Sequence, residues 1–595
     1  MNQERGARAA SGAAIEIKPS ESPPPRRDFL KTLGAAALVL PLESALARLA
    51  SPDEPLSPLA TFDAIPASSD DDLVLPDGFT YDVVMKWGDT FTRSGDRFGF
   101  NNDFIGVFPL GGDGDALLWI NHEYVSLATV SGSIDLYGQT FRMLRGHVPS
   151  VRDYKRDVGG SVLRVRRDGA TGAWTPVLRD PLNRRVTAFT PCRVDGPAAR
   201  LMKVGVVEGT FENCAGGVTP WGTALSCEEN IHLRVPEETD TRGRYHSGGS
   251  FDLPGGHYGW VVEIDPHDPG SAPVKHTALG RFRHEGVGLR TVAGQPLAGY
   301  MGDDRIGGHV WKFVSAGLYQ PGRPESRALL SEGTLFVARF REDGTGEWRP
   351  VLMDTPLDPA PSARDPKPAI PPGAQRLGDV YESLGAALMD AYRAANAIGG
   401  TPSGRPEDIE VHPTDGSVFV AFTASSDRPG LWPNVHGEVW QLEEQGGDPA
   451  SRAFRWSRFS VGGPPDPART GHVFTQPDNL VIDRRGDLWV ATDISAEHIN
   501  APGPYAAFKN AGVFRIPVTG PDRGKPSQFA SLPCEAEATG PAFAPGDSAL
   551  FLSVQHPGER YGTRFSASDA PKGSNWPARR LGRPPEPAVV AMRRR

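Results

Sequence analysis

The sequence predicts an all-β fold, namely a six-bladed β-propeller with inserted loops and a few peripheral helices. The first observation is composition, because 69 glycines and 57 prolines among 595 residues suit a chain of many short strands and turns. The second is that short apolar runs, separated by Gly, Asp and Pro turns, follow one another almost to the end of the chain. The third is that two kinds of run broadly alternate, as the strands of repeated propeller blades do.

Runs of the first kind begin at glycine, as in GGSVLRVRR from Gly159 and GTLFVARFR from Gly333. Runs of the second kind end in polar or acidic residues, as in ALLWINHE, which ends at Glu123, and DLWVATD, which ends at Asp493. The strand-turn-strand unit recurs at intervals of roughly 40 to 90 residues, which is typical of a propeller with inserted loops. Counting about six such units predicts six blades.

Residues 1–47 predict a twin-arginine export signal. Arg26 and Arg27 precede an apolar stretch over residues 33–42 and a small-residue cleavage site at Ala47. The apolar stretch is too short to serve as a stable membrane anchor. We therefore expect a periplasmic or secreted product of twin-arginine export.

The rest of the chain predicts one domain. Residues 48–75 are rich in Pro, Ser and Asp and predict a linker. Residues 76–595 predict a single β-propeller catalytic domain. Within it, residues 376–398 predict a helical insertion, because apolar residues such as Leu384 and Leu388 recur near helical spacing before a Gly-Gly stop.

The charge balance narrows the choice of partners. A formal net charge of -9 gives no reason to expect nucleic acid or an anionic membrane surface. The acidic residues can instead be gathered to bind cations. We expect a monomer that meets a small-molecule substrate.

Residues 213–230, NCAGGVTPWGTALSCEEN, look suited to holding a metal. Side chains alternate across a strand, so Glu228 and Glu229 at the tip of this run point opposite ways, and one of them can reach a shared site. Glycines beside Cys214 allow the backbone to approach an ion closely. The alternative is a disulfide between Cys214 and Cys227, as an exported chain permits, with both glutamates solvated.

The polar ends of the second kind of run favour a common site. In a propeller, equivalent strand ends converge at one mouth of the central channel, which would bring together Glu123, Glu229, Asp304 and Asp493. The alternative is that each is an ordinary solvated strand end. Oxygen-rich ligand sets suit calcium, whereas a thiolate with carboxylates favours a transition metal such as iron.

Several turn motifs resemble those of a known family, the PhoX alkaline phosphatases. The motifs occur in the order NNDF, NHEY, ENCAGGVTPWGTALSCEE, GRFRHEG, GDD with VWKFV, RPEDIEVHP, PDNLVID with LWVATD, and FLSVQHPGE. The resemblance spans about residues 75–590. It implies a six-bladed β-propeller that is exported and hydrolyses phosphate monoesters with iron and calcium.

The same resemblance implies roles for individual residues. Cys214 resembles the thiolate ligand of paired irons, with Glu123 and Glu229 as carboxylate ligands beside it. Glu285, Asp304 and Glu407 match the calcium-binding carboxylates. Arg405 is placed to grip the phosphate bidentately, next to Glu407. The further ligands it implies are Asp478, Asn479 and Asp493.

The leading hypothesis is thus an exported metal-dependent phosphohydrolase that cleaves phosphate monoesters. A cluster of cations can neutralise a phosphate dianion and activate water, so no covalent nucleophile is required. The alternatives are a calcium-dependent lactonase or other esterase on the same architecture, and a non-catalytic calcium-binding propeller. Cys214 discriminates among them, because neither alternative has an evident need for a thiolate beside carboxylates.

Overall fold

The computed structural model describes residues 59, 61–125, 150–323, 328–358, 366–423, 434–464 and 473–595. The predicted export signal, residues 1–47, lies outside the described residues. Across these ranges, the helices are too short or too polar to cross a membrane.

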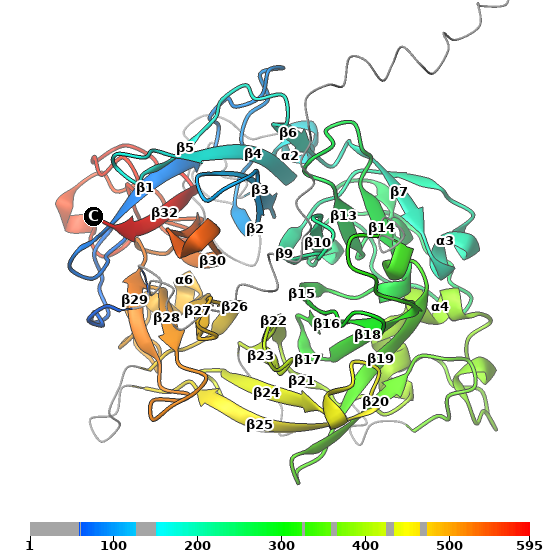
Figure 1. Cartoon of the computed structure of the whole chain (residues 1–595). Coiled ribbons are helices and arrows are strands. Elements are labelled where there is room, and N and C mark those ends of the chain that lie inside the picture. Colours follow the sequence, from blue (N-terminus) through cyan, green and yellow to red (C-terminus); the bar gives the residue numbers. More distant parts are fainter. Residues whose placement is uncertain are drawn as a thin grey trace, which may run out of the picture.

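The protein is mostly β, and its sheets are arranged around a central axis (Figure 1). The first sheet consists of β2 (Asn102–Pro109), β3 (Asp115–His122), β4 (Gly159–Arg167) and β5 (Trp174–Pro176), with β6 (Arg184–Val186) paired to β4. The second runs in the order β8 (Val206–Glu208), β7 (Pro191–Asp195), β14 (Val274–His276), β13 (Val261–Ile264), β10 (Ala224–Glu228) and β9 (Asn213–Val218).

The third sheet has nine strands. Their order is β15 (His284–Arg290), β16 (Pro296–Asp303), β18 (Val310–Leu318), β19 (Gly333–Phe340), β20 (Thr345–Pro350), β25 (Ala453–Val461), β24 (Glu438–Glu444), β23 (Val418–Phe422) and β22 (Pro406–Val411). The runs predicted to begin at Gly159 and Gly333 are strands β4 and β19.

Two four-stranded sheets complete the ring. One has the order β26 (Pro477–Ile482), β27 (Leu488–Thr492), β28 (Gly512–Ile516) and β29 (Ser527–Ser531). The other, here called the closing sheet, has the order β1 (Phe79–Lys86), β32 (Ala588–Arg594), β31 (Leu550–Gln555) and β30 (Glu537–Phe543). Two small ladders pair β11 (Ser247–Gly248) with β12 (Leu253–Pro254) and β17 (Ile306–Gly308) with β21 (Ser403–Gly404).

Six inner strands form a closed ring around the axis. Neighbours contact one another in the cyclic order β2, β9, β15, β22, β26, β30 and back to β2. Between adjacent sheets lie apolar side chains, including the fully buried Trp174, Trp311 and Trp489. This packing fixes the relative positions of the inner strands, and so of whatever side chains they present to the axis.

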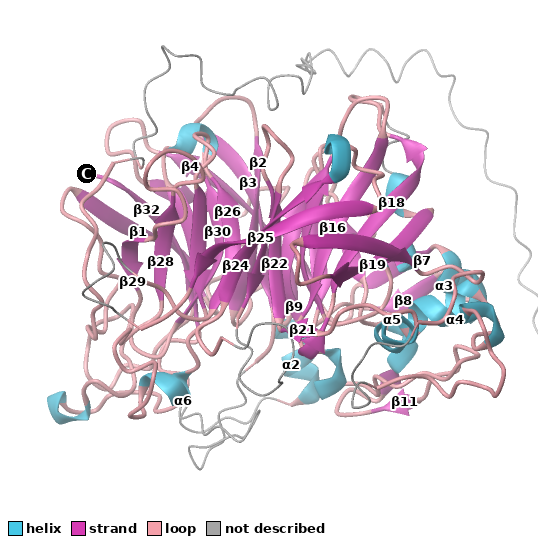
Figure 2. Cartoon of the chain, turned by 90° about the horizontal axis from the view of Figure 1, so that it is seen from below, coloured by secondary structure: helices cyan, strands magenta, loops and turns pink. Residues whose placement is uncertain are grey.

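The α-helices gather towards one face of the ring (Figure 2). They are α2 (Val151–Asp157), α3 (Pro197–Met202), α4 (Leu384–Met389), α5 (Ala391–Ala397) and α6 (Ala496–Ile499). The short 3₁₀ turns are η2 (Ile231–Leu233), η3 (Gly255–His257), η4 (Thr277–Leu279), η6 (Leu377–Asp379), η7 (Gln445–Gly447), η8 (Pro545–Asp547) and η9 (Ala567–Asp569).

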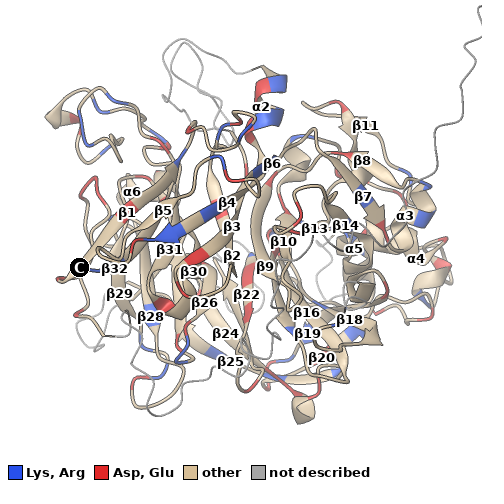
Figure 3. Cartoon of the chain, turned by 45° about the horizontal axis from the view of Figure 1, so that its top comes forward, with Lys and Arg blue, Asp and Glu red and all other residues tan. Residues whose placement is uncertain are grey.

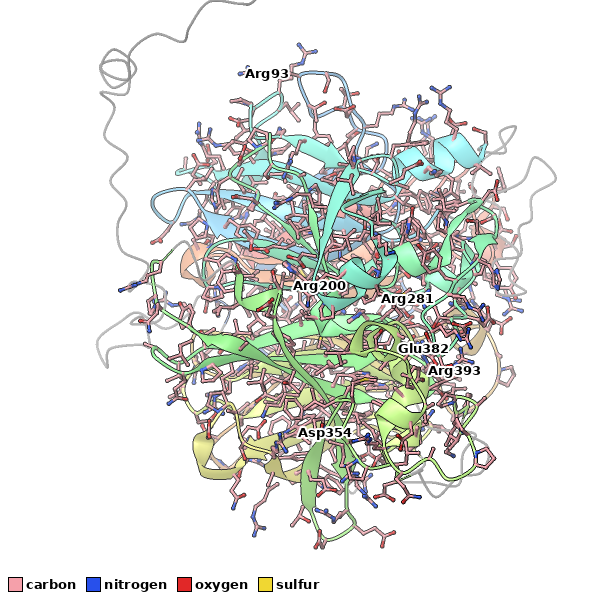
Figure 4. The ribbon with its side chains drawn as sticks, turned by 90° about the vertical axis from the view of Figure 1, so that its right-hand side faces the viewer. Arg93, Arg200, Arg281, Asp354, Glu382 and Arg393 are labelled. Carbon is pink, nitrogen blue, oxygen red and sulfur yellow. The ribbon has the colours of Figure 1, made fainter. Side chains whose placement is uncertain are left out.

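The predicted helical insertion at 376–398 contains two short helices, α4 and α5, instead of one continuous helix. Asp390, with φ -118° and ψ 35°, interrupts the helical backbone between them. Buried Arg281, which is labelled in Figure 4, donates to the carbonyl oxygens of Met389 and Tyr258, so it ties the insertion to the segment before β13. Arg393 makes a similar connection from α5, because it donates to Asp390 and to the carbonyl of Thr239.

The prediction of a linker over 48–75 is wrong for the part that the structure describes. Residues 61–75 lie along the edge strand β29, where Val74 bridges to Ser531 and the Ile65 N–H donates to the Gln528 carbonyl. Phe62 packs on Trp489 and Phe529, and Leu73 is buried. The high content of Pro, Ser and Asp predicted that this segment is exposed to solvent. Its packing is instead decided by a few apolar side chains, because their burial is favourable.

Candidate metal centre

Each of the six inner strands pairs in the same way with the strand that follows it in the sequence. In each case the start of the inner strand pairs with the end of the following strand. The pairs are Asn102 with His122, Asn213 with Glu228, His284 with Asp303, Pro406 with Phe422, Pro477 with Thr492, and Glu537 with Gln555. Distant parts of the sequence therefore present equivalent backbone positions to one end of the axis.

In five of the six inner hairpins, a further backbone hydrogen bond lies next to this terminal pair. The residue after the second strand donates its N–H to the carbonyl of the residue before the inner strand, at 2.9 to 3.1 Å. The donors are Glu123, Glu229, Asp304, Thr423 and Asp493, and the acceptors are Asn101, Glu212, Arg283, Arg405 and Gln476. Four of the acceptors have a φ between 39° and 52°. Such left-handed backbone in non-glycine residues is strained and is often found at functional sites.

A β-bulge follows this pairing in the inner hairpins. An extra residue in one strand lets two consecutive side chains turn to the same side. Glu407 accordingly faces the cluster described below, while the next residue, Asp408, lines a cavity of about 360 Å³ further along the inner strands. Acidic positions on β22 and β30 lie near the centre of the ring in Figure 3.

Four groups of three ligand-type side chains form a continuous line at this end of the axis. Within each group, one ligand atom per residue lies within 4.8 Å of the others. We number these triads in order. They are Asp103, Glu123 and Cys214; Cys214, Glu229 and Glu285; Glu285, Glu407 and Asp478; and Asp478, Asp493 and Glu537. Adjacent triads share one residue, so the line is unbroken.

Most predicted site residues meet in these triads. They are Glu123, Cys214, Glu229, Glu285, Glu407, Asp478 and Asp493. As strand alternation predicted, Glu229 joins the second triad, whereas Glu228 turns away and accepts a hydrogen bond from Lys275 Nζ at 2.6 Å.

Asp304 and Asn479 lie outside the triads. Both carboxylate oxygens of Asp304 accept from Arg405, with Nε to Oδ1 at 2.7 Å and Nη2 to Oδ2 at 2.8 Å. Asn479 Oδ1 accepts from the backbone N–H of Gly540 at 3.0 Å and so contacts the neighbouring inner strand. This contact links β26 to β30.

Sequence reasoning missed Asp103 and Glu537, which stand at the starts of β2 and β30. The available signal was positional. Asp103 lies within the NNDF motif and is the second residue of its inner strand, as Cys214, Glu285 and Asp478 are of theirs, whereas Glu537 is the first residue of β30. Aligning the inner strands to one another would have identified Asp103, but not Glu537, which stands one position earlier in its strand.

Cys214 is a free, buried thiol. The Cys214–Cys227 disulfide considered from the sequence is absent, since all four cysteines are unbridged. Cys214 Sγ lies 3.4 Å from Asp103 Oδ2, whereas Cys227 packs in the apolar core beside Leu225 and Val261.

The triads concentrate negative charge in a buried place. Burial, followed by the charge of Asp103, raises the pKa of Glu123 well above its usual range. Burial, followed by nearby Asp304, does the same for Glu229, and burial with the charge of Glu229 does so for Glu285. For Asp304, burial opposes ionisation but the Arg405 guanidinium outweighs it and holds the pKa at about 2.

The side chains present fit bound cations. Glu285 Oε2 and Asp478 Oδ1 are buried and make no hydrogen bond within the described part of the chain. Such atoms are costly unless a cation or a donor meets them. The first two triads combine the Cys214 sulfur with carboxylates, and the other two offer oxygen only. The site can therefore accommodate both a thiophilic transition metal and hard cations.

Fold and site together define an all-β protein with a line of carboxylates and one thiol, suited to binding cations, at one end of a closed ring of strands. The sequence profile of the family described as "Alkaline phosphatase PhoX" matches residues 60–558. The solved structure of Pseudomonas fluorescens PhoX with vanadate, described as a transition state analogue, is 30% identical with a TM-score of 0.73. That match covers 90% of this chain and 98% of that one. The chain belongs to the PhoX alkaline phosphatase family.

It is therefore an enzyme, a phosphohydrolase that acts on small phosphate esters, as the sequence predicted. Among other solved structures, the gluconolactonase XC5397 from Xanthomonas campestris covers 89% of this chain at 10% identity. Its TM-score of 0.28 is too low to support the lactonase alternative. A comparison with curated protein sequences gave no match.

Proposed function

We propose that this phosphatase hydrolyses phosphate monoesters with an iron and calcium cluster held by the four triads. The observation that carries the proposal is the unbroken line of ligands, in which Cys214, Glu285 and Asp478 each belong to two triads. Shared ligands allow neighbouring cations to lie close together, as a phosphoryl group with several charged oxygens requires.

The ligand chemistry suggests which cation each triad would hold. The first two triads share the Cys214 thiolate and would hold a pair of irons, because sulfur with carboxylates favours a transition metal. The third and fourth triads contain carboxylates alone and would hold calcium. When bound, the cations supply positive charge that neutralises phosphoryl oxygens and lowers the pKa of water.

Arg405 and Glu407 are the catalytic residues that we propose, Arg405 as the contact with the phosphoryl group and Glu407 as a ligand of a neighbouring cation. Asp304 holds the guanidinium plane through its two hydrogen bonds, and Glu407 Oε1 lies 3.2 Å from Arg405 Nη2. The Nε and Nη2 groups of Arg405 are thus engaged in hydrogen bonds with Asp304. The remaining N–H groups would donate to phosphoryl oxygens, while Glu407 faces the third triad.

Substitution of Cys214 tests the iron assignment. In Cys214→Ala we expect loss of iron and of at least about 100-fold in kcat, because the first two triads lose their shared ligand. The measurements are elemental analysis of the purified protein and hydrolysis of a chromogenic phosphate monoester. Cys192→Ala removes a buried free thiol in β7, remote from the triads, and should keep both. Wild-type iron content in Cys214→Ala would refute the assignment.

We also infer that the sheets form six propeller blades. The nine-stranded sheet counts as two blades joined where β20 pairs with β25, one from β15 to β20 and one from β22 to β25. The six inner strands, one for each blade, support this count.

We further propose twin-arginine export, on the basis of the pair Arg26 and Arg27 and the apolar stretch that follows. A monomeric product is a separate proposal. Replacing both arginines with lysines should leave active or precursor protein in the cytoplasm, as cell fractionation would reveal. Size-exclusion chromatography with light scattering should give the mass of one chain. Periplasmic activity that persists in the double variant would rule out this route.

A further inference from the structure

The hairpin of β30 and β31 differs from the other five inner hairpins. Where those present carboxylates or a thiol, this one presents hydrogen-bond donors beside its single acid, Glu537. Thr539 Oγ1 contacts Asp103 Oδ1, and His556 Nε2 lies 3.0 Å from Glu537 Oε2. The hairpin thus supplies donors to its own acid and to a ligand-type carboxylate of another segment.

Gln555, at the end of β31, contacts two carboxylates of the first triad. Its Nε2 donates to Asp103 Oδ2 at 2.8 Å and to Glu123 Oε2 at 3.2 Å. Asp103 belongs to β2 and Glu123 follows β3, so one amide joins two carboxylates from different segments. Both carboxylates belong to the first triad, with Cys214.

The orientation of the Gln555 amide follows from its surroundings. The side chain is fully buried, and its Oε1 has no hydrogen-bond partner in the described ranges. Turning the amide over would place this acceptor oxygen against two carboxylates, which are acceptors as well. The donor orientation is therefore favoured, at the cost of an unsatisfied oxygen. Such a cost is tolerated where the donor contacts have a function.

We propose that Gln555 is a positioning residue that holds Asp103 and Glu123 in the orientation in which they bind iron beside Cys214. This inference rests on the proposed function. Each carboxylate oxygen has two lone pairs, so one N–H bond leaves capacity for a cation. A neutral amide suits this place because lysine or arginine would compete with the cation, whereas a glutamate would repel both ligands.

Gln555 also belongs to the sheet in which the two ends of the ring meet. Gln555 ends β31, which pairs with β32, and β32 pairs with β1. The closing sheet joins strands near residues 80 and 590, and through Gln555 it contacts Asp103 and Glu123.

Gln555→Met tests the proposal, because methionine has similar length but neither donor nor charge. With protein loaded with iron and calcium, we would measure iron retained during chelator titration, the position of the thiolate-to-iron absorption band, and kcat and KM. We expect about 10- to 100-fold weaker iron retention and a shifted band, with kcat reduced more than KM is changed. Unchanged retention and band position would overturn the proposal.

Gln528→Met is the matched control. Gln528 is a buried glutamine in β29 whose Nε2 donates to the Ala530 carbonyl at 3.3 Å, outside the triads. It should leave the band and iron retention unchanged, and an equal loss there would also overturn the proposal.

Gln555→Glu keeps the size and packing but replaces the donor with an acceptor. We expect weaker iron retention here too, so equal or tighter retention would show that charge, and not orientation, governs the site. If wild-type protein holds no iron, the proposed function fails. If wild-type protein holds iron and both Gln555 variants match it, only the positioning role fails.

Discussion

Arg405 combines a strained backbone, a half-buried guanidinium and a paired carboxylate in a single residue. Its φ is 51°, and its Nε and Nη2 both bond Asp304. A guanidinium is planar and carries several N–H donors in fixed directions, so it can hold Asp304 and still meet a phosphoryl group. An ammonium group at the same position would keep the charge but lose this geometry.

Arg405→Lys should therefore lower kcat/KM for a phosphate monoester by about 100-fold, while most of the bound metal is retained. The measurements are steady-state kinetics and elemental analysis. Arg458→Lys is the control, because Arg458 also pairs with a glutamate, Glu438, but lies on β25 away from the triads. Equal kcat/KM in wild type and Arg405→Lys would contradict a substrate contact.

Prediction from sequence was more complete for the strand ends than for the strand starts. Glu123 and Glu229 follow apolar runs, so their approach to one site could be expected. Asp103 and Glu537 precede such runs, and the bulges make alternation unreliable there, as Glu407 and Asp408 illustrate. A rule in which side chains alternate between the two faces of a strand cannot assign consecutive residues to the same face.

At the scale of elements, a buried histidine joins strands β7 and β13. His276 on β14 lies 3.1 Å from Asp195 Oδ1 through Nδ1 and 2.9 Å from Glu263 Oε2 through Nε2. Burial opposes its charge, but the hydrogen bonds to Asp195 and Glu263 prevail and raise its pKa to about 9. Ser331 also donates to Asp195, and Thr223 and Trp221 donate to Glu263.

This contact should make stability depend on pH. Because the pKa of His276 is raised on folding, its contribution is fully present below about pH 6.5 and is lost as pH rises through about 9. The contribution is on the order of 3 kcal/mol. Comparing denaturant unfolding of wild type and His276→Gln, we expect the difference in free energy of unfolding to shrink between pH 6.5 and 10. A difference that is constant with pH would contradict a charged His276.

The elements also show where composition misleads. The apolar spacing around Leu384 correctly indicated helix, but it could not locate the break at Asp390. Residues 61–75 were assigned to a linker, yet three contacts of Phe62 and Val74 with the sheet of β26 to β29 order them. Both outcomes depend on tertiary packing, which a local pattern does not contain.

At the scale of the whole molecule, the closed ring allows the triads to share ligands. Each inner strand contributes at its start, and ring neighbours meet, so Asp478 on β26 serves both the third and the fourth triad. Asp493, which follows β27, belongs to the fourth triad alone. Both residues are aspartates a short distance apart in the chain, but Asp478 belongs to two triads and Asp493 to one.

Asp478→Asn and Asp493→Asn should therefore differ in stoichiometry. We expect Asp478→Asn to bind two fewer calcium ions than wild type and Asp493→Asn one fewer, as elemental analysis of dialysed protein would measure. A cation held at 100 times its Kd stabilises the folded state by about 2.7 kcal/mol. The calcium-dependent gain in Tm should then fall about twice as far in Asp478→Asn. Equal losses in the two variants would show that the third and fourth triads do not share a ligand, and the continuous cluster would separate into independent sites.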